Sequence, residues 1–425
     1  MLVEFSVENY RSFKEKMTLS MIASEDKSHE EQNVITLNDG TRLLKSAIIY
    51  GANASGKSNL ILAMERLAGF VFGSPERKPD EKINVEPYLL DEVSKGMPTH
   101  FEVILYSDGV KYAYGVILSS EKVFEEYLYR FEGKKQRIVF ERFETDQYNF
   151  IDDFEPNPKA AVLDHLKDFT TPNKSYLSNA VMFNYKELES FYYTLLNLFQ
   201  FSNADTYNLL RSAYFTENGK TESMKHTLRT VTNWVKQIDV GISDIRIKES
   251  KELFKDDYFN NGKFNHENHV KMLHHIIAEH KTESGGIAEF NLYANVSDGT
   301  RGFFMLGLAI ADKFSRGGFF VKDELGNDLH TLLLKHLIQM FHGAENKLNS
   351  QLIFTEHDTN VLDLDIFRRD QIWFVEKNPD TKESDLFSLW DFGDKNDINV
   401  EKGYLLGTYG AIPFLKGLTS DGDQS

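Results

Sequence analysis

The stretch YGANASGKSN, residues 50–59, joins the apolar run SAIIY to SNLILAMERLAGFVF, whose apolar residues have helical spacing. Gly51 and Gly56 are separated by four residues and are followed by Lys57 and Ser58, which satisfies the pattern G-x-x-x-x-G-K-[ST]. Glycines let backbone N–H groups surround an anion, and a following helix directs its positive end to the same place. The pattern predicts a nucleotide phosphate site in which Lys57 reaches the β and γ phosphates and the Ser58 hydroxyl ligates Mg²⁺. A purely structural turn is the alternative, but such a turn has no use for the lysine.

The composition is that of an ordinary globular protein, with 425 residues, of which 41% are hydrophobic and 27% charged. The chain is long enough for two or more core-forming units. It contains no cysteine, which excludes disulfides and thiolate metal sites. No stretch approaches 18 consecutive apolar residues, so neither a membrane-spanning segment nor a membrane partner is expected. We expect no secretory signal in the N-terminal residues, and we expect a cytoplasmic location.

Changes in periodicity divide the chain into three expected parts. Residues 1–150 contain strand-like runs, including LLKSAIIY at 43–50 as one buried strand, the loop of residues 50–59, and two hairpins around SDG and EGKK that predict an antiparallel β lobe. Residues 151–240 have helical spacing, which predicts a helical insertion, and they lack the sustained heptad repeat of a long coiled-coil arm. Residues 241–425 begin with strand-like runs and continue with alternating helices and strands, which is typical of a parallel sheet.

Polar residues with catalytic potential follow two of the expected strands. In GGFFVKDEL, Asp323 suits a Mg²⁺ shell, directly or through water, and Glu324 could take a proton from an attacking water. In SQLIFTEHD, the imidazole of His357 could hydrogen-bond a γ phosphate. The alternatives are a surface Asp-Glu pair and a polar residue that merely ends a strand.

The order of these motifs resembles that of ABC-type ATPases: the P-loop, then NVSDGTRGFF, then FFVKDELGNDLH, then FTEHD. More narrowly, the chain resembles the RecF/SMC/Rad50-like group and its compact AAA-labelled members, the AbiL-type, RloA-like and OLD-like ATPases of bacterial abortive infection. NYRSF at 9–13 and YGAIPFL at 409–415 are similar to the starts and ends of that group. The resemblance implies an α/β fold: an ABC-type P-loop NTPase head with a mixed sheet, an antiparallel β lobe and a helical insertion. The N-terminal and C-terminal parts of the head then flank the insertion.

The resemblance also implies an ATP-dependent homodimer in which two heads sandwich two ATP molecules and hydrolyse them to ADP and phosphate. Each ATP lies on the P-loop of one copy and is capped by Ser297 and the Gly299 backbone of the other. Asn327 and Asp328 occupy the position of the loop that crosses the dimer interface.

Within one head, the resemblance assigns a role to each motif. Glu324 is the general base and His357 the γ-phosphate switch, while Asp323 and Ser58 hold Mg²⁺. The implied nucleotide-binding residues are Gly51, Asn53, Ser55, Gly56, Lys57, Ser58, Asn59 and Arg11.

The chain departs from the family pattern at several positions. Ala54 stands where the wider family has glycine. The signature is SDGTR and not LSGGQ, so the part played by Arg301 stays open. Glu356 replaces the usual Thr or Ser before His357 and places a negative charge near the expected γ phosphate. The stretch NVEPYLLDE lies where a Q-loop glutamine is expected and contains none.

Three functions fit an ATPase head of this kind. The first is a switch that controls a separate effector, such as a nuclease, in bacterial anti-phage (abortive infection) defence. The second is a RecF/SMC-like DNA-repair or DNA-clamp ATPase, and the third is the nucleotide-binding subunit of a transporter. The formal net charge of −17 argues against the second without excluding DNA as a partner. The lack of a membrane segment argues against the third, and we favour the first.

Two further groups of residues have both a structural interpretation and a functional one. The histidines at positions 266, 269, 274, 275 and 280 could form a metal site, but a solvated strand face is favoured. The basic run at 130–137 could contact DNA, but the tip of a hairpin is favoured.

Overall fold

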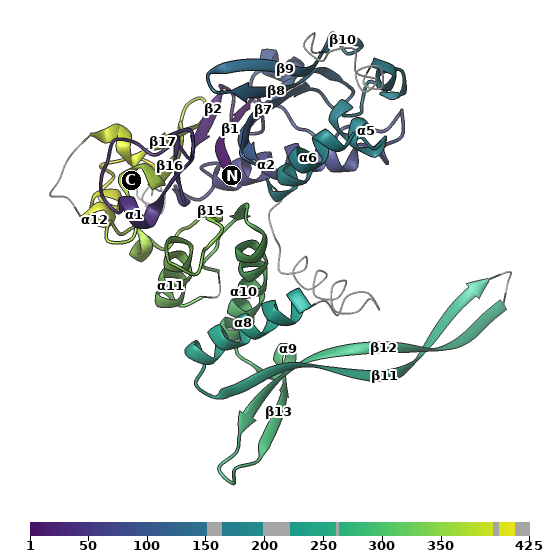
Figure 1. Cartoon of the computed structure of the whole chain (residues 1–425), viewed down its shortest axis with the longest axis vertical. Helices are drawn as coiled ribbons and strands as arrows, with labels where there is room; N and C mark the ends of the chain where they lie inside the picture. The colour runs from purple at the N-terminus through teal and green to yellow at the C-terminus, as the bar shows by residue number, and fades with distance from the viewer. Residues whose placement is uncertain (151–163, 199–221, 261–262, 328, 394–398, 413–425) are drawn as a thin grey trace, which may run out of the picture. The chain divides into compact units, whose positions relative to one another are not determined.

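The computed structural model describes residues 1–150, 164–198, 222–260, 263–327, 329–393 and 399–412, with side chains described for all of these except 222–224 and 252–274. Contacts group the chain into two units, whose elements are shown in Figure 1. Unit 1 comprises Met1–Gln200, Arg316–Gly326 and Leu334–Ser425, and unit 2 comprises Phe201–Ser315 and Asn327–Leu333.

Unit 1 contains a seven-stranded antiparallel sheet of order β10-β9-β8-β7-β6-β1-β2. Apolar and polar residues alternate along its strands, which directs one face of the sheet into the core. Pairing of β6 with β7 and of β8 with β9 confirms the two expected hairpins and the antiparallel lobe. The strands are β1 (Leu2–Glu8), β2 (Met17–Ser20), β6 (Thr99–Ser107), β7 (Val110–Leu118), β8 (Val123–Glu132), β9 (Lys135–Phe143) and β10 (Gln147–Phe150).

Unit 1 also contains a five-stranded mixed sheet of order β14-β15-β5-β16-β17. Strands β14, β15, β5 and β16 are parallel, and β17 is antiparallel to β16. The expected parallel sheet is therefore confirmed, and the carboxyl ends of its four parallel strands lie at one edge, where ligands bind in such sheets. The strands are β14 (Phe319–Lys322), β15 (Gln351–Thr355), β5 (Ser46–Tyr50), β16 (Ile372–Lys377) and β17 (Ser384–Ser388).

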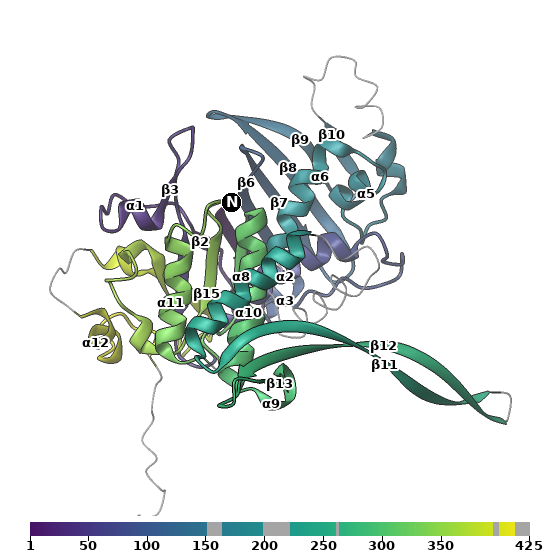
Figure 2. The ribbon, with the colours of Figure 1, turned by 60° about the horizontal axis from the view of Figure 1, so that its bottom comes forward.

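Helix α2 (Lys57–Gly73) begins directly after the glycine loop and shares one hydrophobic core with both sheets of unit 1. It contributes buried residues such as Leu60, Met64 and Leu67 to this core. Two further helices, α5 (Tyr176–Met182) and α6 (Glu189–Leu195), join the same core. Figure 2 shows α6 beside α2, and the rings of Phe72 in α2 and Tyr192 in α6 lie 4.3 Å apart between centroids.

The expected single strand at 43–50 is in fact two strands that belong to different sheets. β4 (Arg42–Leu44) pairs with β3 (Val34–Thr36), whereas β5 joins the parallel sheet. Lys45 stands at the change: its N–H donates to the Asn33 carbonyl, and its own carbonyl accepts from the N–H of Leu352. No turn residue such as glycine or proline separates the two strands in LLKSAIIY, so the sequence did not mark this transfer from one sheet to the other.

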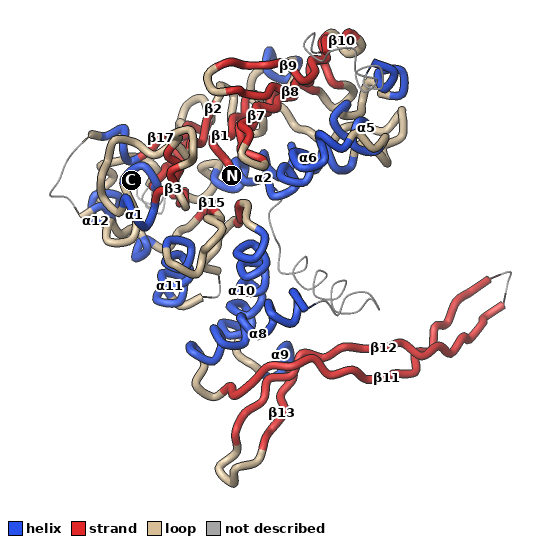
Figure 3. The backbone as a smooth tube through the Cα atoms, viewed as in Figure 1, coloured by secondary structure: helices blue, strands red, loops and turns tan. Residues whose placement is uncertain are grey.

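Unit 2 consists of helices around a core of their own and a three-stranded sheet of order β11-β12-β13. The helices are α8 (Glu222–Ile238), α9 (Leu292–Asn295) and α10 (Asp298–Arg316). Gly307 of α10 allows close approach to α8, because an added Cβ would lie 3.0 Å from the Val231 side chain. Strands β11 (Ile242–Asn260) and β12 (Lys263–Lys281) form one long hairpin, visible in Figure 3, and β13 (Ile287–Asn291) pairs with the base of β12.

The remaining helices are short, apart from α11 (Thr331–His342), which buries Leu334, Leu337 and Phe341. They are α1 (Glu30–Asn33), α3 (Glu92–Gly96) and α12 (Val400–Leu405). Within the described ranges, no helix combines the length and the apolar character that crossing a membrane requires.

Candidate functional site

The glycine loop curves around the ammonium group of Lys57, the first residue of α2. The Lys57 Nζ donates to the carbonyl oxygens of Gly51 at 2.6 Å and Ala52 at 3.2 Å. Only 8% of Lys57 is exposed. Burial lowers the pKa of Lys57, while the negative charges of nearby Asp323, Glu324 and Glu356 act in the opposite direction. The loop thus holds a desolvated cation at its mouth.

The two glycines of the loop stand where other parts of the chain approach closely. A Cβ on Gly51 would lie 2.3 Å from the backbone oxygen of Val375 in β16. Gly56 has φ +121°, and a Cβ there would lie 2.5 Å from the Ser384 Oγ and 2.9 Å from the Ser12 Oγ. Only glycine therefore fits at either position.

Asp323 and Glu324 follow β14 and are held by the end of the neighbouring strand β15. The Thr355 hydroxyl donates to Asp323 Oδ1 at 2.5 Å and accepts from the backbone N–H of Glu324 at 2.8 Å. The Thr355 carbonyl accepts from the N–H of Leu325. Glu324 itself has φ +48°, a left-handed conformation that is uncommon for residues other than glycine. The turn that carries both carboxylates is thus fixed by Thr355.

His357 and Glu356 follow β15 and face different surroundings. The His357 side chain is 58% exposed, whereas that of Glu356 is 1% exposed. Glu356 Oε1 accepts from the backbone N–H groups of His357 and Asp358, and Oε2 accepts from that of Gly326. The buried Glu356 carboxylate therefore bonds backbone amides, and its Oε1 also lies 3.4 Å from His357 Nδ1.

Arg11 lies in the turn after β1 and reaches the start of α2. Its Nη1 is 3.5 Å from Asn59 Oδ1, and its Nε is 3.1 Å from Glu86 Oε2. The Arg11 N–H also donates to the Glu86 carbonyl. Glu86 belongs to the stretch NVEPYLLDE, so a carboxylate stands in the segment where the family pattern predicted a glutamine. Arg11 thus contacts Asn59 in the first turn of α2, and its approach to phosphates stays a prediction.

Ser297 and Gly299 belong to unit 2, as does Asn327, whereas the residues of the P-loop belong to unit 1. Ser297 precedes α10, and its Oγ accepts from the N–H of Thr300 at 3.3 Å, as an N-cap residue does. Arg301 is held by the Tyr293 carbonyl and by Asp298. Asp328 lies outside the described residues.

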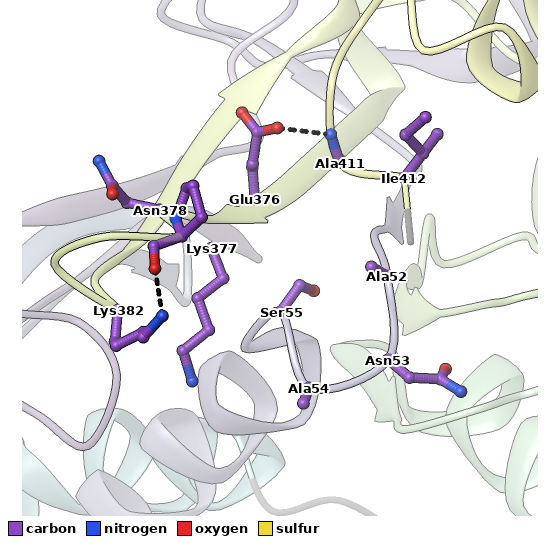
Figure 4. Close-up of a pocket in the computed structure, with 11 residues that line it drawn as sticks. Ala52, Asn53, Ala54, Ser55, Glu376, Lys377, Asn378, Lys382, Ala411 and Ile412 are labelled. Atoms are coloured by element: carbon purple, nitrogen blue, oxygen red, sulfur yellow. Dashed lines mark hydrogen bonds between the residues drawn. The ribbon is translucent and has the colours of Figure 1, made fainter. Parts of the chain in front are cut away.

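A cavity of about 330 Å³ adjoins the P-loop on the β16 side (Figure 4). Residues 52–55 form one wall, and residues 376–379 with Lys382 form another. Ala411 and Ile412 form a third side of the cavity, and the N–H of Ala411 donates to Glu376 Oε1. Because β15 and β16 flank β5 on opposite sides, the cavity lies on the side of β5 away from the strand that carries His357.

The residues expected to hold Mg²⁺ are a hydroxyl and a carboxylate, the oxygen ligands that this ion prefers. Ser58 is exposed in the first turn of α2, and Asp323 is partly exposed at the end of β14. The buried Ser55 Oγ has no hydrogen-bond partner among the described residues, as expected of a loop built to receive a ligand. The residues present therefore fit the ion and its nucleotide.

The two other candidate groups lie on strand β12 and on the β8–β9 hairpin. Among the described residues, no cluster of three or more side chains is suited to a metal ion. His275 bonds Ser250, while the side chains of the histidines at 266, 269 and 274 lie outside the described residues. At the tip of the β8–β9 hairpin, Glu132 pairs with both Arg130 and Arg137. The basic run is a hairpin tip, as favoured, and two of its cations are paired internally.

Sequence reasoning missed several residues that shape the loop. Ser12 and Ser384 contact Gly56 closely, and the Ser384 Oγ donates to the Ser55 carbonyl at 2.5 Å. No pattern marks a serine more than 320 positions away from the loop. Thr355 could have been noticed, because it carries a hydroxyl at the carboxyl end of a buried strand.

Comparisons with known proteins give one family and several structures. The family described as "AAA domain, putative AbiEii toxin, Type IV TA system" matches residues 46–363. A structure titled SmcHead bound to the C-winged helix domain of ScpA is 12% identical with TM-score 0.43, covering 91% of this chain and 97% of that chain. The SMC head domain from Thermotoga maritima is 11% identical with TM-score 0.39, covering 91% of this chain and 98% of that chain.

A third structure, the Smc head domain with an extended coiled coil bound to the C-terminal domain of ScpA from Pyrococcus furiosus, is 11% identical with TM-score 0.40. It covers 96% of this chain and 98% of that chain. A comparison with curated protein sequences finds no match.

Proposed function

The chain belongs to this AAA-domain family of ABC-type ATPases, as its motifs indicated, and we propose that it binds ATP on the loop of residues 51–59 and hydrolyses it to ADP and phosphate. The observation that supports this most is the convergence of groups on the carboxyl edge of the parallel sheet. The P-loop follows β5, the Asp323-Glu324 turn follows β14 and His357 follows β15. The charges of Asp323 and Glu324 act on Lys57, so they lie near the mouth of the loop.

In this proposal each group has one task. Lys57 and the backbone N–H groups of the loop bind the β and γ phosphates, and Arg11 approaches them from the turn after β1. Bound Mg²⁺, held by Ser58 and Asp323, supplies charge neutralisation at the phosphates. Glu324 accepts a proton from the attacking water, and the His357 imidazole hydrogen-bonds the γ phosphate.

We further propose that ATP joins two copies of the chain, with Ser297 and Gly299 of one copy capping the ATP of the other. Ser297 stands at the N-terminus of α10, where backbone N–H groups and the helix dipole favour an anion. The resulting dimer would act as a switch for a separate effector, such as a nuclease, in anti-phage defence. The family's description, which names a toxin of a toxin–antitoxin system, supports a defence role.

Two substitutions test the ATPase proposal. Lys57→Ala should abolish binding of a fluorescent ATP analogue, because the loop loses its cation. Glu324→Gln should bind ATP normally and accumulate as an ATP-bound dimer in light scattering, because hydrolysis is blocked. Lys82→Ala and Glu31→Gln, which change exposed residues elsewhere, serve as controls. A Glu324→Gln protein that stays monomeric at saturating MgATP would contradict the dimer, and one that hydrolyses ATP normally would contradict the base.

Purification from the native host separates the two remaining functions. Tagged Glu324→Gln protein would be recovered with MgATP, and bound protein and nucleic acid would be identified. A stoichiometric protein partner that is lost with Lys57→Ala supports the effector switch. Retained DNA without a protein partner supports the alternative, a RecF-like DNA clamp.

A further inference from the structure

Glu356 places a buried carboxylate between the two loops that carry the proposed base and the proposed switch histidine. Its side chain is 1% exposed at the end of β15. Glu356 Oε2 accepts from the N–H of Gly326 at 2.9 Å, in the turn after β14. Oε1 accepts from the N–H groups of His357 at 2.8 Å and Asp358 at 3.1 Å. One carboxylate thus connects the loops that follow two adjacent strands.

The neighbouring residue, Thr355, completes this connection. Its hydroxyl contacts Asp323 and Glu324, and its carbonyl accepts from the N–H of Leu325. Thr355, the last residue of β15, and Glu356, which follows it, therefore hold residues 323–326 of the turn after β14. The turn needs such support because Glu324 has a φ of +48°.

Gly326 is shaped to receive the carboxylate. A Cβ on Gly326 would lie 2.5 Å from Glu356 Oε2, so any larger residue would push the carboxylate away. Hydrogen bonds to an ionised carboxylate are stronger than those between neutral groups, and leaving a buried N–H unpaired costs about 1–3 kcal/mol. The arrangement is therefore selective for a carboxylate at position 356 and a glycine at position 326.

We propose that Glu356 is a positioning residue that sets the Glu324 carboxylate in register with His357 for ATP hydrolysis. This inference rests on the proposed function, because it takes Glu324 as the base and His357 as the γ-phosphate contact. Glu356 acts through the backbone N–H groups of both loops and through its Oε1, which lies 3.4 Å from His357 Nδ1. The Thr or Ser usual at this position is too short to bridge the same amides in the same way.

The first test is Glu356→Gln, which keeps the size of the side chain. The glutamine amide has only one oxygen, so it can accept from the N–H groups of His357 and Asp358 or from that of Gly326, but not from both sides. Its NH₂ group then faces the remaining backbone N–H, and two donors cannot form a hydrogen bond. We expect kcat to fall on the order of 10- to 100-fold, because small misplacements of catalytic groups lower rates by such factors. KM and ATP affinity should be nearly unchanged. Gly326→Ala should give the same kcat effect by displacing the carboxylate from the other side.

Glu126→Gln is the matched control. Glu126 is fully buried in unit 1 and accepts hydrogen bonds from the N–H groups of Tyr176 and Leu177 and from two hydroxyls. Glu126 also lies 3.9 Å from the buried Arg142, so the substitution should lower stability at least as much, and it should leave kcat unchanged at a temperature where the protein is folded. If Glu356→Gln and Glu126→Gln have equal kcat, the positioning role is wrong.

A measurement without ATP separates this inference from the proposed function. Hydrogen exchange of peptides that cover residues 323–327 should be faster in Glu356→Gln than in wild type, and unchanged in Glu126→Gln. Unchanged exchange in Glu356→Gln would overturn the bridge. An inactive wild type, or an active Glu324→Gln protein, would instead overturn the ATPase proposal while leaving the bridge measurable.

Discussion

Replacing Gly56 by alanine tests whether the phosphate loop is kept in shape by close packing. A Cβ at this position would lie 2.5 Å from the Ser384 Oγ and 2.9 Å from the Ser12 Oγ. Both hydroxyls are buried and engaged: the Ser384 Oγ donates to the Ser55 carbonyl, and the Ser12 Oγ accepts from Asn59 Nδ2. The substitution therefore adds backbone strain at φ +121° and also displaces hydrogen-bonded serines.

The expected loss of stability follows from these two parts. A residue other than glycine held at positive φ costs roughly 1–2 kcal/mol. Each hydrogen bond displaced costs roughly 1 kcal/mol. The free energy of unfolding should thus fall by roughly 3–4 kcal/mol when both serines move. Adding Ser384→Ala removes the nearest obstructing atom, so the double variant should be more stable than the sum of the single changes predicts.

Urea unfolding followed by circular dichroism measures these differences. Gly133→Ala is the control, because Gly133 also has positive φ, +62°, but no atom lies within 4 Å of an added Cβ. It should show the backbone strain without the collision, and it should bind ATP normally. If Gly56→Ala unfolds at the same urea concentration as Gly133→Ala, or if Ser384→Ala brings no recovery, packing against the serines does not shape the loop.

Two further predictions concern other parts of the chain. Burial lowers the pKa of His342 from 6.5 to about 3, helped by the positive charges of Lys45 and His29. The unfolded chain therefore binds the proton first, and His342 withdraws stability as pH falls from 6.5 towards 3, by at most about 1.4 kcal/mol per pH unit. In His342→Gln the dependence of unfolding free energy on pH should be flatter in that window, and equal slopes would contradict this. Ser297→Arg should lower ATP turnover without weakening ATP binding to the monomer. Ser297→Asn, which retains an N-cap, controls for damage to α10. Equal turnover in Ser297→Arg and wild type would show that Ser297 does not act in trans.

Much of the fold could be predicted from local patterns because the physical cause is local. Period-two alternation identified the hairpins of the antiparallel lobe, and alternating helices and strands identified the parallel sheet. The glycine loop was recognisable because its glycines, lysine and serine are consecutive in the chain. The full extent of β11 and β12 was not predicted, since KESKELFKDDYFNNGKFNHENH is polar and lacks the alternation that marks a strand.

The candidate site was harder to predict where contacts join distant segments. Glu356 was expected near the γ phosphate because it precedes His357 in the sequence. In the structure the Glu356 carboxylate is buried, and its Oε1 lies 3.4 Å from His357 Nδ1. Its Oε2 accepts from the N–H of Gly326, a contact with another loop that the order of residues in the chain does not indicate. The contacts of Ser384 with the loop depend on β17 folding back beside β16, which no motif of the sequence states.

The two halves of the site differ in how far they are prepared for ATP. The Asp323–Gly326 turn and the His357 loop are already joined by the hydroxyl of Thr355 and the carboxylate of Glu356. Lys57, by contrast, bonds the carbonyls of its own loop and must release them to reach a phosphate.

Arg11 is likewise paired with Glu86, whose side chain is 54% exposed, so the contact is weak and easily exchanged. If ATP binds as proposed, the two cations must rearrange, whereas the Asp323 carboxylate and the backbone that carries Glu324 and His357 are already held. Binding energy is then used to move flexible cationic side chains, and the backbone that presents the catalytic groups needs no reorganisation, which favours catalysis.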